Sequence, residues 1–197
     1  MLTPEQEAEQ SGRPSKLTQN LKRAEAKLRN EKMEVAHNFD AEGNPMFVAT
    51  SNSTEYIEFS KDQIAQLKDG VSTHNHPKGG SFSPADVEFA IFADLKEIRA
   101  VSPETGYTFV LQRPKSGWNK KMWNRFTTSR LKIETELQNQ TYPVTSHDPN
   151  QKKTMTREMG MRFVSELVVQ DWIMSMVDDG VPRNERPIYH ELIDAKN

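Results

Sequence analysis

The N-terminal part of the chain shows one clear helical pattern of hydrophobic positions. They recur with spacings of four, three and four residues, at Leu17, Leu21, Ala24 and Leu28. This spacing places all of them on one face of an α-helix, so the pattern predicts a helix that ends near Asn30. Residues 1–15 are polar apart from a few positions, and we expect them to form a flexible tail.

Residues 16–114 combine this helix with short segments that are rich in β-branched and aromatic residues. Such segments predict strands at 32–37, 46–50, 56–59, 98–101 and 107–111, with a further strand that begins at Val71. Two more helices are predicted, one over 61–68 and one after Asp86. Strands separated by helices indicate an α/β domain, a mixed β-sheet flanked by helices.

The remainder of the chain has a different pattern. Residues 112–118 are typical of a linker, and helices are predicted at about 119–138 and 154–178. We therefore expect residues 115–197 to form a helical extension. Because the apolar residues of the last helix spread over several of its faces, it should be buried on several sides. It would pack either on the domain or, through these C-terminal helices, on a second copy in a homo-oligomer.

Composition limits the class of protein. The chain has 197 residues, of which 35% are hydrophobic, and its net charge is −2; its mean hydropathy is −0.80. A nearly neutral chain argues against a surface devoted to nucleic acid. The absence of cysteine excludes disulfides and thiolate metal ligands. No apolar run reaches membrane-spanning length and the N-terminus has no signal-like apolar core, so we expect a cytoplasmic protein with no membrane contact.

The densest group of reactive side chains lies in the segment 73–86. His74 and His76 are two residues apart, so in an extended strand their imidazoles point to the same face. The Ser-Pro pair that follows is typical of a helix start and places Asp86 in the first helical turn. Two imidazoles and one carboxylate, with one position left for water, are the ligands of a catalytic zinc site. We expect one Zn²⁺ ion held by His74, His76 and Asp86.

This segment resembles the signature of the JAMM (JAB/MPN) zinc metalloprotease family, which is His-x-His-Pro, a short loop and Ser-x-x-Asp. The His-Asn-His-Pro sequence and the glycine pair are most similar to its RadC-like and phage-associated branches. Nine residues separate His76 from Asp86, one fewer than is usual in the family. The resemblance covers about residues 16–114 and implies the JAMM fold, a mixed sheet sandwiched between helices.

The resemblance also implies an activity. JAMM proteins hydrolyse a peptide or isopeptide bond, often in a ubiquitin-like conjugate, with a zinc-activated water and a glutamate as general base. That glutamate lies on an early strand upstream of the histidines, and Glu34 is the match by position. Glu31 falls at the helix end, and Glu55 and Glu58 lie too close to the later helix. A protein or peptide substrate is therefore expected, including a phage-related protein target.

The serine of the motif, Ser83, has two candidate roles. The resemblance implies that it donates a hydrogen bond near the metal and helps to hold the oxyanion. As the N-cap of the following helix it would only stabilise that helix, by about 1 kcal/mol. Ser81 takes the first role if the shorter loop shifts the register. The remaining histidines lie outside the motif and are interpreted as non-ligands: His37, His147 and His190.

Two other classes of function have some support in the sequence. The stretch 105–133 contains no acidic residue but has seven basic ones, with Trp118, Trp123 and Phe126 among them, which is also typical of nucleic-acid binding. We favour the alternative that these aromatic residues pack on the domain. The basic residues would then line the approach to the zinc and favour acidic stretches of a substrate. The other class is a phage assembly or interaction protein with a vestigial metal site.

Overall fold

The computed structural model describes residues 14–139 and 149–193, with side chains for 14–136 and 164–193. The flexible tail predicted for residues 1–15 lies almost entirely outside the described residues, as do His147 and most of the loop expected before the last helix. Within the described ranges, no helix is both long enough and apolar enough to cross a membrane.

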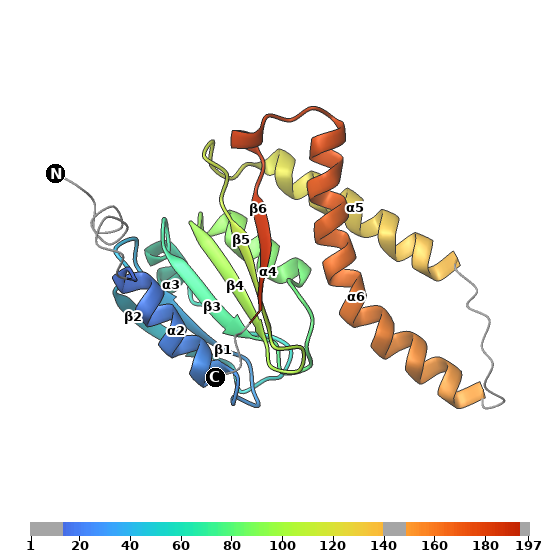
Figure 1. The fold of residues 1–197 in the computed structure, drawn as a ribbon, viewed down its shortest axis with the longest axis horizontal. Coiled ribbons are helices and arrows are strands. Elements are labelled where there is room, and N and C mark those ends of the chain that lie inside the picture. The colour runs from blue at the N-terminus through green and yellow to red at the C-terminus, as the bar shows by residue number, and fades with distance from the viewer. Residues whose placement is uncertain (1–13, 140–148, 194–197) are drawn as a thin grey trace.

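Six strands form one mixed sheet in the order β2-β1-β3-β4-β5-β6 (Figure 1). The strands are β1 Val35–Phe39, β2 Pro45–Thr50, β3 Val71–Asn75, β4 Glu97–Ser102, β5 Tyr107–Gln112 and β6 Ile188–Ile193. Strands β3 and β4 are parallel, whereas the other neighbouring pairs are antiparallel. A parallel pair needs a crossover connection, and a helix between β3 and β4 supplies it. The α/β class agrees with the prediction.

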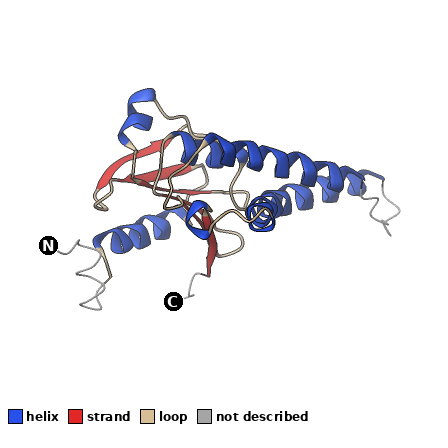
Figure 2. Cartoon of the chain, turned by 90° about the horizontal axis from the view of Figure 1, so that it is seen from above, coloured by secondary structure: helices blue, strands red, loops and turns tan. Residues whose placement is uncertain are grey.

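Helices cover both faces of this sheet (Figure 2). They are α2 Lys16–Leu28, α3 Lys61–Gln66, α4 Pro84–Phe92, α5 Lys120–Asn139 and α6 Pro149–Asp178. On one face α2 contacts β1 and β3 and encloses a small core with Leu21, Phe39 and Val71. On the other face α4, α5 and α6 share a larger core with the sheet, in which Phe126 and Trp172 are fully buried.

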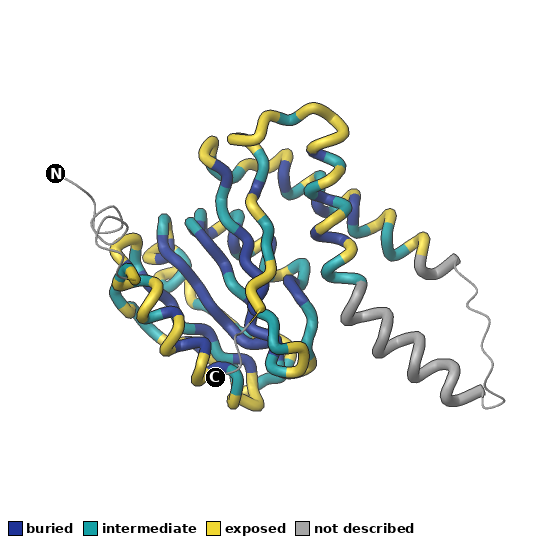
Figure 3. Tube along the Cα trace, viewed as in Figure 1, coloured by how far each residue is buried: buried dark blue, intermediate teal, exposed yellow. Residues whose placement is uncertain are grey.

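The central strands β3 and β4 are the most deeply buried part of the sheet (Figure 3). All five residues of β3 are buried, although its sequence, VSTHN, is mostly polar. Buried polar side chains are costly unless they have partners, so this strand indicates a site where polar groups are paired or serve a function. Both histidines of the predicted site belong to it or directly follow it.

The predicted strand at 56–59 is wrong. The segment is not part of the sheet, although its residues have high β propensity. A strand requires a neighbouring backbone to pair with, and here the Glu58 N–H donates instead to the Ser51 side chain at 2.7 Å. Local propensity identified residues that favour a strand, but it carries no information on whether a neighbouring strand is present.

Strand β6 was not predicted. Residues 115–197 do contain the two expected helices, but they also return to the sheet, where β6 pairs with β5. Buried residues of α5 and α6 belong to the same core as those of the sheet and α4. The segment 115–197 is therefore not a purely helical extension, because it completes the sheet of the domain that precedes it.

The basic and aromatic helix α5 packs on the domain, as the favoured alternative predicts. Trp118 and Trp123 are half-buried against the main core, and the Trp118 indole N–H donates to the Leu95 carbonyl at 2.9 Å. Two of the basic residues on α5 pair with carboxylates, Lys132 with Asp171 of α6 and Arg125 with Asp179, which directly follows α6.

The expectation that the basic residues of 105–133 line the approach to the metal site holds for only one of them. Among these residues, Arg130 alone borders the cleft that contains the site. Four of the seven basic residues also have acidic partners, which are Arg113, Arg125, Arg130 and Lys132, so most of these charges are already paired instead of being free for phosphate groups.

Candidate metal centre

The two histidines come from the end of the central strand. His74 lies in β3, and His76 is the first residue beyond its last, Asn75, with its N–H donating to the Val101 carbonyl at 2.8 Å. The extended backbone therefore continues through His76 and places both imidazoles on the same face. Only 4% of His74 and 9% of His76 is exposed, so both rings are held between the sheet and the α4 side of the molecule.

The carboxylate comes from the first turn of α4. Ser83 is the N-cap, and its hydroxyl accepts from the Asp86 N–H at 3.3 Å while the Ser83 N–H donates to Asp86 Oδ2 at 2.6 Å. This reciprocal capping box fixes both the helix start and the direction of the aspartate side chain. Ser83 thus has the structural role that the sequence allowed, and it holds Asp86 in place. Its proposed oxyanion role stays a prediction.

The loop between the ligands closes although it is one residue short of the family pattern. Gly79 and Gly80 have backbone φ angles of 77° and 101°, which residues with a Cβ rarely adopt. A Cβ on Gly79 would also lie 3.1 Å from a carboxylate oxygen of Glu104. The glycine pair therefore lets the loop turn sharply enough to return Asp86 to the histidines.

Donor atoms of three residues converge at this point, with both carboxylate oxygens of Asp86 facing the histidines. The distances are 2.9 Å between His74 Nε2 and His76 Nε2, 3.1 Å between His74 Nε2 and Asp86 Oδ1, and 3.3 Å between His76 Nε2 and Asp86 Oδ2. Ligands at about 2.0–2.1 Å from a tetrahedral ion lie about 3.3 Å apart. The separations are thus close to those of a metal site, and among the described residues this is the one group of histidines and carboxylates that can hold an ion.

The orientation of His76 also suits ligation. Its Nε2 faces His74 and Asp86. A contact between the ring and the backbone of Gly80, which also helps to raise the His76 pKa, supports this orientation. Metal-binding histidines are typically oriented in this way.

The pKa values of Asp86 and His76 are both shifted in this group. Burial alone would raise the pKa of Asp86, but the neighbouring His74 and His76 hold it well below its ordinary value. For His76, burial alone would lower the pKa, but the charge and hydrogen bond of Asp86, helped by Glu34, raise it above the ordinary value. Without a metal ion, the site therefore favours an ionised Asp86, and His76 keeps its proton to a higher pH than an ordinary histidine.

As the pH is lowered, we expect metal affinity to begin to fall at a higher pH than it would at a site whose histidines have the ordinary pKa. The raised pKa of His76 means that a metal ion must displace its proton over a wider pH range. Affinity should be full above that pKa and fall by about tenfold per pH unit per proton as the pH drops through it. Zinc titrations against a competing chelator at several pH values measure this. Zinc affinity that begins to fall only at or below the pKa of an ordinary histidine would contradict this expectation.

Ser83→Ala should weaken zinc binding by about 10–100-fold, because the hydroxyl that orients the Asp86 turn is lost. The stability cost of losing the cap should be about 1 kcal/mol. Ser60→Ala is a matched control, since Ser60 caps α3 with an equivalent capping box to Gln63. It should cost similar stability without altering zinc affinity. Equal zinc affinity in both variants would show that Ser83 acts on the helix alone.

Glu34 lies beside this group. It immediately precedes β1, where its N–H donates to the Ser53 carbonyl and its C=O accepts from the Thr50 hydroxyl. Glu34 is 8% exposed. Burial raises its pKa above the ordinary value, and the charges of His76 and His74 partly oppose this shift. These electrostatic interactions indicate that its carboxylate lies near both histidines.

A cleft of about 1080 Å³ contains Glu34 and all three candidate ligands. Its lining comes from the segment 54–59, from Phe89 of α4, from the loop 77–83 and from α5 and α6. From the two long helices it includes Arg130, one of the basic residues expected to line the approach, and two polar side chains that the sequence did not single out, Glu134 and Ser165. Their positions follow from packing between distant segments, for which the sequence carries no local signal.

Ser81 also lies at the cleft, but its environment differs from that of Ser83. It is buried and its hydroxyl is 3.4 Å from that of Ser165 on α6. The loop therefore joins the metal ligands to the long helix. His37 and His190, interpreted as non-ligands, are not part of the group of converging donors.

Comparisons of the chain with family models, curated proteins and solved structures find no match.

Proposed function

We propose that the chain is a zinc-dependent metallopeptidase of the JAMM type, which hydrolyses a peptide or isopeptide bond with Glu34 as general base. The observation that carries this proposal is the convergence of the donor atoms of His74, His76 and Asp86, each pair separated by 3.3 Å or less, beside a buried glutamate. It agrees with the roles that the sequence motif implies.

The donor set fits zinc better than magnesium or calcium. Mg²⁺ and Ca²⁺ prefer oxygen ligands, whereas two imidazoles and one carboxylate suit Zn²⁺. Three protein ligands also leave one position of a tetrahedron open, as in catalytic zinc sites. Because the site borders a cleft instead of being enclosed, that position is accessible to a substrate.

Zinc held there would polarise the substrate carbonyl and lower the pKa of a water molecule to about 7. Glu34 would accept the proton of the attacking water on its carboxylate and deliver it to the nitrogen of the leaving amine. Its raised pKa supports this role, since a carboxylate that binds a proton more readily is a better carrier at neutral pH. Asp86, fixed by the Ser83 capping box, would keep its ligand oxygen in position throughout.

The dimensions of the cleft support a polypeptide substrate. Its volume of about 1080 Å³ lies just above the range for small-molecule sites, roughly 300–1000 Å³. Partly exposed aromatic side chains, Tyr56, Phe59 and Phe89, form one side, and Phe59 stacks on Phe89 with ring centres 4.4 Å apart. Such surfaces bind apolar side chains of an extended peptide.

The first test is elemental analysis of the protein purified without chelators. We expect about one zinc per chain, lost on His76→Ala and on dialysis against a chelator. The second is incubation of the zinc-loaded protein with a complex mixture of peptides and ubiquitin-like conjugates, followed by mass spectrometry. New termini should appear only with zinc present. Protein that contains no zinc and takes up none would overturn the proposal.

A further inference from the structure

The two edges of the sheet differ in how they are protected. Edge strands expose unpaired N–H and C=O groups, and natural proteins block them with proline, lysine or bulges. Strand β2 begins with Pro45 and has an irregular register opposite Asn38 and Phe39. Strand β6, with the sequence IYHELI, has no proline, lysine or bulge.

The open edge of β6 also carries apolar side chains. Ile188 is 37% exposed, Leu192 39% and Ile193 76%. In the described part of the chain, β5 alone pairs with β6, which forms the end of the sheet (Figures 1 and 2). An unprotected and partly apolar edge of this kind is typical of a strand that pairs with another chain.

The direction of the backbone groups in β5 can be derived from the hydrogen bonds. Arg113 N–H donates to the Lys96 carbonyl, one position beyond the β4–β5 ladder. Because backbone direction alternates along a strand, Arg113 and every second residue before it face β4. The residues between them face β6, and these are Thr108, Val110 and Gln112.

This alternation fixes which groups of β6 are free. Thr108, Val110 and Gln112 lie opposite three residues of β6, which are Leu192, His190 and Ile188. Those three residues point their N–H and C=O groups at β5. The backbone groups of Tyr189, Glu191 and Ile193 consequently point away from the sheet, where no described segment pairs with them.

We propose that the chain forms a two-fold symmetric dimer in which β6 pairs antiparallel with β6 of a second copy. Two-fold symmetry is the commonest arrangement of homo-oligomers, and it requires the outward-facing residues to lie opposite one another. The register centred on His190 satisfies this condition. Tyr189 then lies opposite Glu191 of the second copy, and these residues exchange N–H···O bonds in both directions.

The side chains are complementary in this register. Ile188 lies opposite Leu192 of the second copy, so these two exposed apolar residues cover each other. The Tyr189 hydroxyl, 3.3 Å from the Glu191 carboxylate within one chain, lies beside the same carboxylate of the other. The register centred on Glu191 would place two carboxylates face to face, which is destabilising. The net charge of −2 adds little repulsion between copies.

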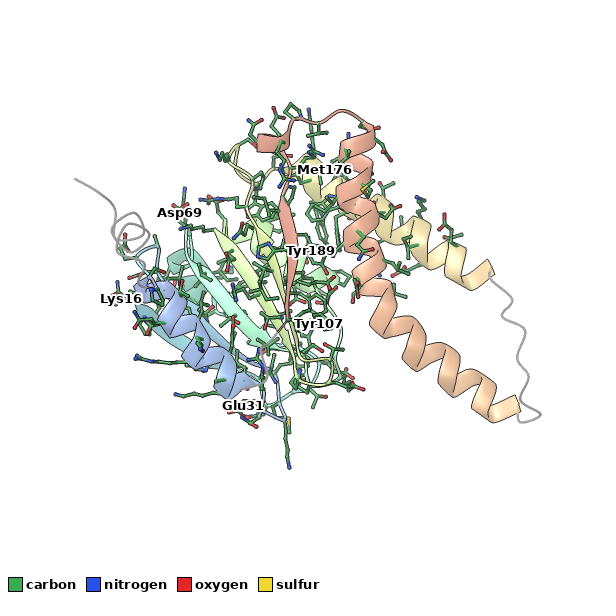
Figure 4. The ribbon with its side chains drawn as sticks, in the orientation of Figure 1. Lys16, Glu31, Asp69, Tyr107, Met176 and Tyr189 are labelled. Atoms are coloured by element: carbon green, nitrogen blue, oxygen red, sulfur yellow. The ribbon has the colours of Figure 1, made fainter. Side chains whose placement is uncertain are left out.

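The dimer would also adjoin the candidate metal centre. Tyr189, labelled in Figure 4, packs edge-on against Phe82 in the loop between His76 and Asp86, with ring centres 6.4 Å apart. Pairing that fixes β6 would therefore hold one wall of the cleft in place. The dimer itself does not depend on zinc or on activity, so it can be tested separately from the proposed function.

The first test is the mass of the full chain in solution by light scattering. The expected value is twice the chain mass of 22.6 kDa. Glu191→Pro removes an outward-facing N–H and leaves the bonds to β5 intact, so it should halve the mass. The bond between the His76 N–H and the Val101 carbonyl fixes the direction of the backbone groups along β3. The same alternation, followed through the pairing of β3 with β1 and of β1 with β2, shows that the backbone groups of Val48 in β2 also point away from the sheet. Val48→Pro is the matched control and should remain dimeric.

The second test uses the absence of cysteine from the chain. In the register centred on His190, the two copies of this residue lie about 4.5–5.5 Å apart between Cα atoms, within reach of a disulfide. His190→Cys should therefore cross-link under mild oxidation, whereas Glu191→Cys should not. A monomeric parent chain at all concentrations would overturn the proposal. So would a dimer that survives Glu191→Pro and is not cross-linked through His190→Cys.

Discussion

Glu34→Gln is expected to lower the rate of hydrolysis by about 10²–10⁴-fold while zinc stays bound. Glutamine has nearly the same shape and can occupy the same space between β1 and the histidines. Its amide cannot accept the proton of the attacking water, so the transfer to the leaving amine is lost. Glu34 is not among the three converging donors, and its replacement should therefore leave the metal content unchanged.

The control is a second carboxylate at the same cleft. Glu55 lines the cleft, but its side chain is 69% exposed and pairs with Lys78. Glu55→Gln should change the rate by no more than a few fold, whereas His76→Ala should lose both zinc and activity. Initial rates on a cleaved substrate, with zinc measured in each variant, distinguish these cases. If Glu34→Gln retains the parent rate, another residue is the base.

The parts of the site that could be predicted from the sequence are those governed by short-range geometry. The alternation of a strand puts His74 and His76 on one face, and the Ser-Pro helix start puts Asp86 in the first turn of α4; both features are present in the structure. Each depends on residues within one element or its immediate neighbour. Glu34 was different, because only the family resemblance identified it, and its burial beside the histidines follows from the pairing of β1 with β3.

The parts that could not be predicted depend on segments far apart in the sequence. Strand β6 forms because β5 lies beside it, and the cleft gains Glu134 and Ser165 because α5 and α6 pack against the same core as the sheet. The segment 56–59 shows the reverse, since residues that favour strands found no neighbouring strand. Propensity and periodicity describe an element, but the partner of that element decides whether it forms.

Arg99→Ala is expected to destabilise the fold by about 3–5 kcal/mol. Arg99 lies on β4 beneath α2, where its Nε donates to Glu25 Oε1 at 2.5 Å and its Nη1 to Glu97 Oε1 at 2.9 Å. The side chains of Arg99, Glu25 and Glu97 are only 9–12% exposed. Removing the guanidinium would leave two buried carboxylates without their charge partner. The resulting loss of free energy of unfolding is larger than the net stabilisation that the ion pairs provide. Urea unfolding of the variant and the parent measures the difference.

The surface pair of Arg125 and Asp179 is the natural comparison, since both side chains are much more exposed, at 36% and 60%. Water screens such a pair, so Arg125→Ala should cost about 0–1 kcal/mol. A third variant separates charge from packing: Glu25→Gln, Glu97→Gln and Arg99→Met together remove all three charges and keep similar volumes. Because no buried charge remains unpaired, this triple variant should be more stable than Arg99→Ala alone. If Arg99→Ala and Arg125→Ala lower the free energy of unfolding by the same amount, water must reach the carboxylates beneath α2. Burial would then add nothing to the contribution of these ion pairs to stability.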